Sequence, residues 1–166
     1  MNKKDIERYL EMLGRRLANR GIKGEMYVVG GAAMALAFDA RRVTRDVDAV
    51  FAPKLDIYQA AKEIAEEQGL PQSWLNDAVK GYLVKEDERR MMVFDRPGLR
   101  VYSASAEYLF AMKCLAARRE DEDDIRFLLN LIGIKNLNEA LKIVEEVYPQ
   151  HRISPRTQFL LEEILG

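Results

Sequence analysis

Residues that commonly bind zinc or form disulfides are nearly absent from this sequence. The 166 residues include one cysteine, Cys114, and one histidine, His151. An internal disulfide is therefore impossible, and a zinc site built from the usual cysteine and histidine ligands is excluded. Cys114 falls in an apolar helical pattern and is expected in the core, whereas His151 is expected to be solvated in a loop.

Long apolar runs and an excess of charge of one sign are absent as well. The N-terminal segment MNKKDIERYLEMLG is charged throughout, so we expect no signal peptide, and no run approaches the length of a membrane span. The 26 basic and 27 acidic residues give a formal net charge of −1, which argues against nonspecific nucleic-acid binding by the whole surface. We predict a cytoplasmic protein without membrane contacts, with a local basic group at Arg41, Arg42 and Arg45.

Apolar periodicity predicts an α/β (α+β) fold, with a small mixed sheet flanked by helices and a helical C-terminal part. A chain of this length buries about 68–70% of its unfolded surface and needs no disulfide or metal for stability. We expect a sheet-containing core with an N-terminal helix at 1–104 and a helical region at 105–166, packed as a single compact unit. The predicted elements before that region are helices 3–20, 32–38, 55–68 and 73–80, and strands 26–29, 42–49, 90–94 and 99–102.

The chain is organised around the stretch Tyr27–Phe51, which reads YVVGGAAMALAFDARRVTRDVDAVF. Its apolar first strand is stopped by Gly30-Gly31, and a short helix of small residues follows. Glycine has no Cβ, so backbone N–H groups can approach a phosphate closely there, and the start of a helix favours anions. Gly30 and Gly31 are therefore predicted to bind phosphate groups of a nucleotide.

A second strand, after a turn at Asp39-Ala40, carries polar side chains at every other position. Because side chains alternate along a strand, four of them are predicted to share one face: Arg42, Thr44, Asp46 and Asp48. The apolar residues between them are predicted to lie on the opposite face: Val43, Val47 and Ala49. Aspartate is depleted in strands, and two neighbouring carboxylates repel each other unless a cation lies between them. A divalent metal held by Asp46 and Asp48 is therefore predicted.

The order of a strand, Gly-Gly, a helix and a second strand with D-x-D resembles the core of the DNA polymerase β-like nucleotidyltransferases. The finer pattern, GGAAMAL followed by R-x-T-x-D-V-D, is similar to the branch that holds AbiEii-type toxins and related minimal nucleotidyltransferases. The likeness is carried by Tyr27–Phe51, with weaker similarity downstream. A D-x-D alone is a weak signal, whereas the whole combination at this spacing is considerably more specific.

The resemblance implies an enzyme that moves a nucleoside monophosphate from an NTP to an acceptor, with Mg²⁺ or Mn²⁺ as cofactor. Asp46 and Asp48 are expected to hold the metal, and Arg42 and Thr44 to contact the nucleotide. The acceptor is an RNA such as a tRNA, a protein hydroxyl or a small molecule, and the motif does not encode which. The resemblance also suggests the toxin of a toxin–antitoxin pair, with an antitoxin protein as partner. The oligomeric state stays open.

Members of this superfamily place a third metal-binding carboxylate on a strand downstream of D-x-D. Here the predicted strand 99–102 offers Arg100 and Tyr102 but no acid. Asp95 is the nearest candidate, and it is expected in the turn before that strand. This departure weakens the case for a standard two-metal site of the polymerase type.

The segment from Ser73 to Lys80 contains the only tryptophan and is predicted to be a short helix with Ser73 as its N-cap. Two interpretations remain open. Either the apolar residues around Trp74 anchor the segment on the core, or its polar residues border the nucleotide cleft: Asn76, Asp77 and Lys80. The resemblance favours the second, because a similar W-L-N-D segment recurs in relatives of the minimal branch.

Lys113 stands out within Tyr108–Leu115, an otherwise apolar run that predicts a central, buried helix. A buried lysine must pair, reach solvent or act, and Asp124 would share its face if the helix continued for three more turns. AbiEii-like toxins have a helical lysine followed by an R…D-x-x-D segment, which Lys113, Arg118, Asp121 and Asp124 resemble. Either Lys113 pairs to orient the C-terminal helices, or it contacts the triphosphate or bridges the catalytic site with Asp124. Asp121 and Asp124 equally fit an ordinary acidic helix start.

Two rival functions remain open beside nucleotidyl transfer. A catalytically degenerate relative would hold a nucleotide or a partner protein without chemistry, which the missing third carboxylate favours. Alternatively, the central stretch is an α/β scaffold with a coincidental D-x-D, and the protein serves mainly in assembly. Turnover with an NTP separates the first rival from an enzyme, and titration with Mg²⁺ or Mn²⁺ tests the second.

Overall fold

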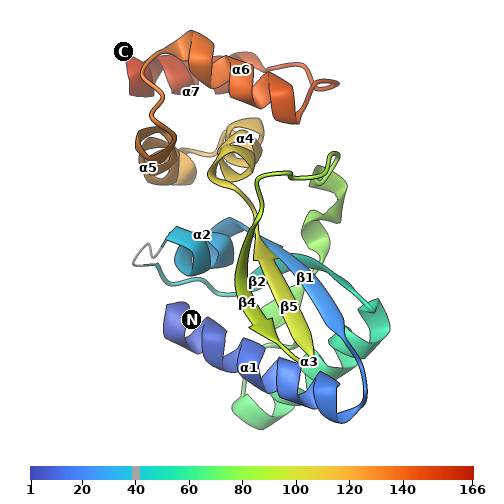
Figure 1. The fold of residues 1–166 in the computed structure, drawn as a ribbon. Helices are drawn as coiled ribbons and strands as arrows, with labels where there is room; N and C mark the ends of the chain where they lie inside the picture. The colour runs from blue at the N-terminus through green and yellow to red at the C-terminus, as the bar shows by residue number, and fades with distance from the viewer. Residues whose placement is uncertain (39–41) are drawn as a thin grey trace. The chain divides into compact units, whose positions relative to one another are not determined.

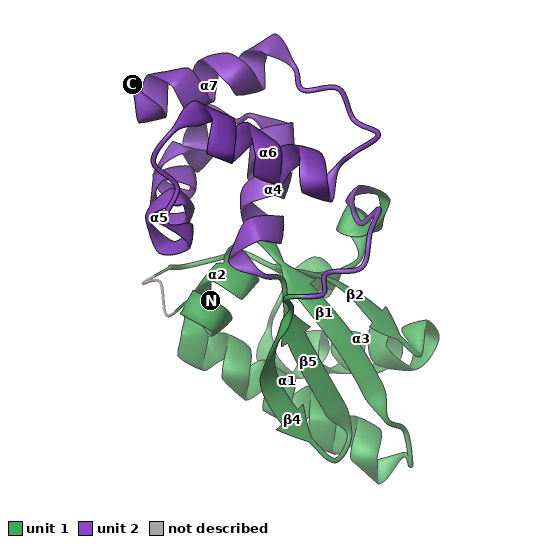
Figure 2. Ribbon diagram, turned by 45° about the horizontal axis from the view of Figure 1, so that its top comes forward, with its two compact units in different colours: residues 1–81, 89–104 green, residues 82–88, 105–166 purple. Residues whose placement is uncertain are grey.

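The structure, a computed structural model, describes residues 1–38 and 42–166 (Figure 1). The chain divides into two units (Figure 2). Unit 1 comprises Met1–Gly81 and Arg89–Ala104, and unit 2 comprises Tyr82–Glu88 and Ser105–Gly166. The predicted turn at Asp39-Ala40 and the basic residue Arg41 lie outside the described residues.

Unit 1 contains a five-stranded sheet whose strands are connected and preceded by helices. Its elements in chain order are α1 (Lys3–Asn19), β1 (Gly24–Val29), α2 (Gly30–Phe38), β2 (Val47–Ala52), α3 (Lys54–Gln68), the 3-10 turn Gln72–Trp74, β3 (Leu75–Asn76), the 3-10 turn Ala78–Tyr82, β4 (Met91–Arg96) and β5 (Leu99–Ser103). The strand order is β3-β2-β1-β5-β4, with β1 antiparallel to β2 and parallel to β5. This mixed sheet confirms the predicted α/β fold.

Local sequence signals set the ends of the helices in unit 1. The Asn2 side chain accepts a hydrogen bond from the Asp5 N–H, and the Asp5 carboxylate accepts one from the Asn2 N–H, which forms a capping box for α1. Gly69 ends α3 with a positive φ of 67°, the conformation that favours glycine at this position. The turn at Pro97-Gly98 joins β4 and β5 into the predicted hairpin.

One face of the sheet is covered by α1 and α3. A Cβ atom on Gly24 would lie 3.1 Å from Cδ1 of Leu17 in α1 and 3.1 Å from Cδ1 of Ile57 in α3, so both helices reach the sheet at this point. Alternate side chains of the strands point to this face, and they are almost fully buried: Met26, Val28, Val47, Ala49, Leu75, Leu99 and Val101.

The opposite face of the sheet is more polar. The strand residues that alternate with the buried set are half-buried or exposed along most of this face: Glu25, Tyr27, Asp48, Val50, Arg100 and Tyr102. Asp48 pairs with Val29, the last residue of β1, so Asp48 lies at the end of the strands where α2 begins. The fold thereby brings the D-x-D segment to the Gly-Gly turn.

The second strand is shorter than predicted. It begins at Val47, so residues 42–46 precede the strand, and Val43, which was expected on the buried face, is 78% exposed. The cause is a contact distant in sequence: the Thr44 N–H donates to the Met1 carbonyl at 2.9 Å, and the Met1 nitrogen donates to the Thr44 carbonyl at 2.8 Å. These two hydrogen bonds use the N–H and the carbonyl of Thr44, which in a longer strand would bond to a neighbouring strand.

The predicted helix over 73–80 is wrong. Two 3-10 turns flank the short strand β3, which pairs in parallel with β2 through Val47 opposite Leu75 and Asp48 opposite Asn76. Trp74 is fully buried and donates its indole N–H to the Ala61 carbonyl of α3 at 2.9 Å. Trp74 therefore anchors the segment on the core, and the anchored segment supplies the edge strand.

Unit 2 is helical in its C-terminal part, as predicted. Its elements are α4 (Ala106–Ala116), the 3-10 turn Arg119–Asp121, α5 (Glu122–Ile132), α6 (Leu137–Val147) and α7 (Pro155–Leu165). Polar N-caps start three of these helices by accepting a hydrogen bond from a backbone N–H of the first turn: Ser105 for α4, Asn136 for α6 and Ser154 for α7.

The segment Tyr82–Glu88 belongs to unit 2, although unit 1 residues flank it in the chain. The hydroxyl of Tyr148 donates to the Tyr82 carbonyl at 2.9 Å, and the hydroxyl of Tyr108 donates to the Lys85 carbonyl at 3.0 Å. The Asp87 carboxylate accepts hydrogen bonds from the N–H and the hydroxyl of Ser105 at 2.7 and 2.9 Å. Burial raises the pKa of both tyrosines, so their hydroxyls remain donors at neutral pH.

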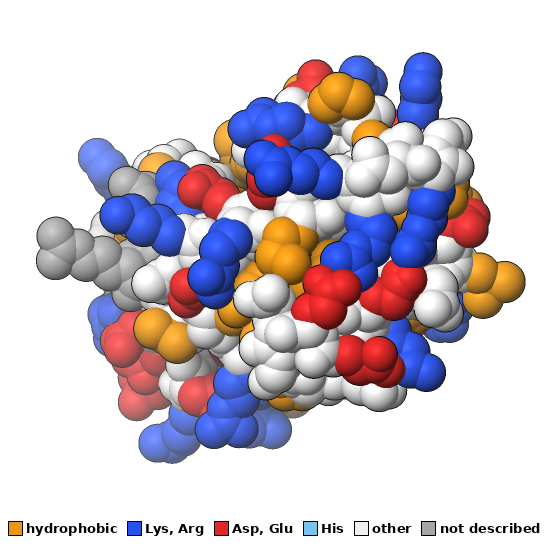
Figure 3. All heavy atoms as spheres, turned by 90° about the horizontal axis from the view of Figure 1, so that it is seen from below, with side chains coloured by type: hydrophobic (Ala, Val, Ile, Leu, Met, Phe, Trp, Pro, Cys, Tyr) orange, Lys and Arg blue, Asp and Glu red, His pale blue; other side chains and the backbone are white. Residues whose placement is uncertain are grey.

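Charges of both signs are mixed on the surface, as the near-zero net charge predicts. On the face drawn in Figure 3, lysine and arginine side chains alternate with aspartate and glutamate side chains. Ion pairs link neighbouring elements of unit 1, among them Arg16 with Glu67 at 2.7 Å and Arg96 with Glu11 at 3.1 Å. Among the described residues, no helix has both the length and the apolar character needed to cross a membrane.

Candidate functional site

The turn between β1 and α2 is formed by Gly30 and Gly31. Gly30 has a positive φ of 62°, a conformation that costs residues with a Cβ free energy. A Cβ atom on Gly30 would lie 3.5 Å from Oδ2 of Asp48, and one on Gly31 would lie 3.0 Å from Oγ1 of Thr44. The two glycines therefore bring the backbone at the start of α2 directly against two of the predicted site residues.

Asp46 and Asp48 lie close enough for their charges to interact. Burial raises the pKa of Asp48, and the negative charge of Asp46 raises it further, while a hydrogen bond from Asn76 acts in the opposite direction. Asp46 and Asp48 are thus a pair of like charges, and Asp48 lies beside the Gly-Gly turn. This is the arrangement expected from the D-x-D spacing, although only Asp48 lies within the strand.

Thr44 reaches the site from the segment before β2, in which Arg42 also lies. The Thr44 hydroxyl donates to the Asp46 carbonyl at 2.9 Å, so Thr44 orders the backbone of Asp46 as well as contacting Gly31. Arg42 is half-buried, and it does not share a strand face with Asp48 as predicted. The bond from Met1 to Thr44 was not foreseen, because no local pattern indicates a contact over this distance in the chain.

Asn76 lies beside the two aspartates. It stands opposite Asp48 in the β2–β3 pairing, and its Nδ2 donates to Oδ2 of Asp46 at 3.4 Å, a long hydrogen bond. The same Nδ2 is 3.3 Å from the Ser73 carbonyl, and Oδ1 accepts from the Ala78 N–H at 3.2 Å. The amide is therefore held on both sides by its own turn with its NH₂ group toward the carboxylates.

Asp77 and Lys80 belong to a separate network at the sheet edge. Asp77 accepts a hydrogen bond from the Tyr58 hydroxyl at 2.6 Å and pairs with Lys54 at 3.0 Å and with Lys80 at 3.8 Å. The Tyr58 hydrogen bond, followed by the Lys54 contact, lowers the pKa of Asp77. This network ties β3 to α3, and none of these contacts includes Asp46 or Asp48.

Asp95 is too far along the sheet to supply a third carboxylate. It lies in β4 opposite Arg100 of β5, Arg100 lies opposite Glu25 of β1, and Glu25 lies opposite Ala52 of β2. Ala52 lies four residues beyond Asp48 along β2, a separation of roughly 13 Å. The Asp95 carboxylate instead pairs with Arg100 at 3.5 Å.

The predicted residues Lys113, Asp121 and Asp124 come together in unit 2. The Lys113 ammonium lies 2.9 Å from Asp121 and 3.0 Å from Asp124, and the side chains of Lys113 and Asp124 are only 13% and 12% exposed. The helix does not continue to Asp124: α4 ends at Ala116, and Asp124 belongs to the separate helix α5. Arg118 is exposed and lies 3.9 Å from Glu120.

The comparison with protein families matches residues 8–154 to a family described as a nucleotidyltransferase of unknown function, DUF6036. This match covers most of the chain, including the Gly-Gly turn, both aspartates, Asn76 and the Lys113 cluster. The chain belongs to this nucleotidyltransferase family. Neither the curated proteins nor the solved structures gave a match.

The donor atoms of the two aspartates suit a magnesium ion in part. Asp46 and Asp48 offer carboxylate oxygens, which Mg²⁺ prefers, and Mg²⁺ usually completes its shell with waters and substrate phosphates. A cation there would relieve the repulsion that raises the pKa of Asp48. Among the described residues, no group of three histidine, cysteine, aspartate or glutamate side chains is arranged to hold a metal. The two carboxylates thus fit a metal whose remaining ligands are waters or nucleotide phosphates.

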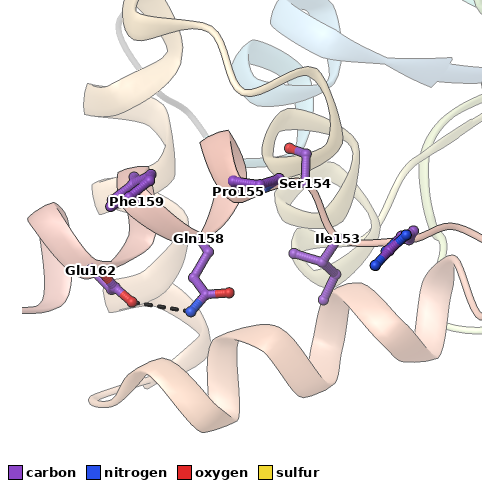
Figure 4. A pocket seen from close by; sticks show the side chains of 7 residues that line it. Ile153, Ser154, Pro155, Gln158, Phe159 and Glu162 are labelled. Carbon is purple, nitrogen blue, oxygen red and sulfur yellow. Dashed lines mark hydrogen bonds between the residues drawn. The ribbon is translucent and has the colours of Figure 1, made fainter.

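A separate hollow of about 650 Å³ lies in unit 2, at the start of α7 (Figure 4). Phe159, which is 70% exposed, lies on one of its walls, and Gln158 donates a hydrogen bond to Glu162 at 3.2 Å nearby. None of the residues predicted from the sequence as site residues lines it. We therefore assign the candidate site to the Gly-Gly turn and the aspartate pair.

Proposed function

We propose that this chain transfers a nucleoside monophosphate from an NTP to an acceptor hydroxyl in a Mg²⁺-dependent reaction. The observation that carries the proposal is the contact between the Gly-Gly turn and the D-x-D segment, with Gly30 against Oδ2 of Asp48. A phosphate-binding turn and a metal-binding carboxylate pair are useful to one reaction only when they lie side by side. Membership of a nucleotidyltransferase family supports the same reaction class.

Nucleotidyl transfer depends mainly on positioning and on charge neutralisation. The acceptor hydroxyl gives its proton to water, its oxygen forms a bond to the α-phosphorus, and the bond from that phosphorus to the bridging oxygen breaks to release pyrophosphate. Gly30 and Gly31 would receive phosphate oxygens on backbone N–H groups at the start of α2. Asp46 and Asp48 would hold the Mg²⁺, which supplies neutralisation of the phosphate charge. Thr44, by fixing the Asp46 backbone, keeps the two carboxylates at the turn.

Further members of the proposed site come from the resemblance to AbiEii-type toxins. Arg42 would contact a phosphate or the acceptor, and Lys113 would contact the triphosphate with Asp124 as its partner. In unit 2, Lys113 is already neutralised by Asp121 and Asp124. A role for Lys113 in catalysis is therefore tested by kinetics, in which its loss should lower kcat/KM more than it changes the fraction of folded protein.

Radiolabelled NTPs test the proposed reaction directly. Each α-³²P-labelled NTP is incubated with Mg²⁺ and with tRNA, total protein or small-molecule acceptors, and label in the acceptor is measured. D46A and D48A should abolish transfer. D95N is the matched control, because Asp95 lies at the other end of the sheet in an exposed ion pair, and it should transfer at the wild-type rate. Absence of transfer to every acceptor, or full activity of D48A, would contradict the proposal.

We also propose that the protein is the toxin of a toxin–antitoxin pair. The support is the resemblance of GGAAMAL and R-x-T-x-D-V-D to the AbiEii branch, so this part is tested in cells. Induced expression of the wild type should arrest growth, whereas D48A expressed to the same level should not. Equal growth with both proteins would contradict the toxin role and leave the enzymatic proposal to be judged by the transfer assay.

A second candidate function is a nucleotide-binding or partner-binding module without catalysis. It is favoured by one observation: β5 carries no acid beside Asp48, and Asp95 lies far along the sheet. Calorimetry would then show NTP binding that needs Asp48, with no transfer to any acceptor class. Turnover with any acceptor would eliminate this candidate.

A further inference from the structure

Asn76, one of the residues that the sequence suggested as bordering the nucleotide cleft, lies beside the D-x-D segment in the structure. It lies on the edge strand β3 opposite Asp48, on the same face of the sheet. Its amide nitrogen is 3.4 Å from Oδ2 of Asp46. Asn76 is thus the neutral polar side chain that stands beside both acids of the D-x-D segment.

The orientation of the Asn76 amide is fixed by bonds unrelated to the aspartates. Oδ1 accepts from the Ala78 N–H at 3.2 Å, and Nδ2 lies 3.3 Å from the Ser73 carbonyl. Because the backbone N–H can only meet the amide oxygen, the opposite orientation would place two acceptors or two donors together. The NH₂ group is therefore held toward the carboxylates before any ligand binds.

A neutral donor is well suited to this position. A lysine or arginine would pair with the aspartates and compete with a metal for them, and a third acid would add to their repulsion. An amide satisfies one carboxylate lone pair and leaves the remaining oxygens for a cation. Groups that orient metal ligands in this way typically contribute 10–100-fold to metal affinity.

We propose that Asn76 is a positioning residue that orients the Asp46 and Asp48 carboxylates for a divalent cation. The inference rests on the proposed function, because it assumes that these aspartates hold the metal. It assigns to β3 a role in the site, through an amide that leaves the carboxylate oxygens available to the cation. Asn76 acts through the aspartates and need not touch the nucleotide.

Two variants separate this role from a purely structural one. N76A removes the donor toward the aspartates and the bonds of the turn. N76D keeps an oxygen for the Ala78 N–H but replaces the donor with a third negative charge. N130D is the matched control, because Asn130 is exposed on α5 in unit 2 and the substitution changes the net charge equally.

The readout is the binding of Mn²⁺ alone, measured by the loss of its free electron paramagnetic resonance signal, together with the melting temperature in EDTA. We expect N76A to bind Mn²⁺ about 10–100-fold more weakly than wild type, with an unchanged circular dichroism spectrum. We expect N76D to melt below N130D in EDTA and to regain the difference when Mn²⁺ is added. If N76A does not fold, the comparison of N76D with N130D decides.

The possible results separate this inference from the proposed function. Wild-type Mn²⁺ affinity in N76A, or equal melting of N76D and N130D in EDTA, overturns the positioning role of Asn76. A wild-type protein that binds no Mn²⁺ overturns both this role and the metal dependence of the reaction. Weakened Mn²⁺ binding by N76A in a protein that transfers no nucleotide supports the role of Asn76 and contradicts the proposed activity.

Discussion

A Cβ atom added to Gly30 would lie 3.5 Å from Oδ2 of Asp48, which is van der Waals contact. The last residue of β1 is paired with Asp48, and Gly30 follows immediately. The antiparallel pairing of β1 with β2 therefore sets this distance, and a phosphate bound at the turn would lie beside the carboxylate.

G30A is expected to lose activity because of its contact with Asp48, and a matched variant separates this effect from backbone strain. Alanine at this positive φ should cost roughly 1–2 kcal/mol in the free energy of unfolding, and the methyl group would occupy the space between the turn and Asp48. Because misplacement of reacting groups by about 1 Å can cost 100-fold in rate, we expect kcat/KM to fall by about 100-fold. Steady-state kinetics with saturating Mg²⁺ measure this effect.

G21A is the control for the backbone strain that alanine causes at a positive φ. Gly21 has a similar φ of 69°, and a Cβ on it would meet no atom within 4 Å. It should lose comparable stability and keep its activity per folded molecule. Equal activity losses in G21A and G30A would show that strain, and not the contact with Asp48, explains the defect.

D48N should stabilise the protein when no metal is bound. The substitution removes one of two like charges from a partly buried position, and relief of this kind is typically worth on the order of 1 kcal/mol. The melting temperature in EDTA should therefore rise by about 2–4 °C, while any increase caused by Mg²⁺ should disappear. D95N should change neither quantity, and a D48N protein that melts below wild type in EDTA would contradict the assignment.

The stabilisation by D48N should also depend on pH. The pKa of Asp48 is raised above its ordinary value of 3.8 by burial and by Asp46, so the folded state holds this proton more tightly than the unfolded state. The cost of the charged carboxylate is full above the folded pKa and is lost as the pH falls toward the unfolded value. Urea unfolding in EDTA should therefore show the advantage of D48N shrinking as the pH is lowered.

K113M should destabilise unit 2 strongly. The Lys113 ammonium contacts both Asp121 and Asp124, and the side chains of Lys113 and Asp124 are largely buried. Removal of one partner from a buried ion pair typically costs about 3–5 kcal/mol. K142M, on the exposed side of α6, is the control for loss of a positive charge. Similar melting temperatures for the two variants would show that the cluster contributes little to folding.

Cys114 should resist modification until unit 2 unfolds. The side chain is fully buried, and burial raises the pKa of its thiol, so the reactive thiolate is scarce in the folded protein. Reaction with a disulfide reagent should be at least about 1000-fold slower in buffer than in guanidinium, because labelling requires an opening of the fold. Rapid labelling in buffer would contradict the packing described for α4.

Features that depend on neighbouring residues could be predicted from the sequence. The helix α3 and its end at Gly69, the hairpin around Pro97-Gly98 and the start of α7 at Ser154-Pro155 all follow from short patterns with a direct physical cause. The order of the Gly-Gly turn and D-x-D likewise indicates a nucleotidyltransferase family, which the family match supports.

Features that depend on distant contacts could not be predicted in this way. Thr44 leaves the strand because it pairs with Met1, and the alternation of polar residues from 42 to 46 contains no sign of that bond. Leu75 and Asn76 form a strand only because β2 offers a free edge, whereas their own sequence context is typical of a helix. The position of Asn76 beside Asp48 therefore became visible only in the folded chain.

Because Tyr82–Glu88 belongs to unit 2, no single cut in the gene separates the two units. Cutting at Ala104 would leave the helical fragment without the carbonyls that receive the Tyr108 and Tyr148 hydroxyls, and without the carboxylate that caps α4 at Ser105. The N-terminal fragment would contain Tyr82–Glu88 without the rest of unit 2, against which this segment packs. We therefore expect each fragment to be less stable than the undivided chain, so a division of the gene at Ala104 is best avoided.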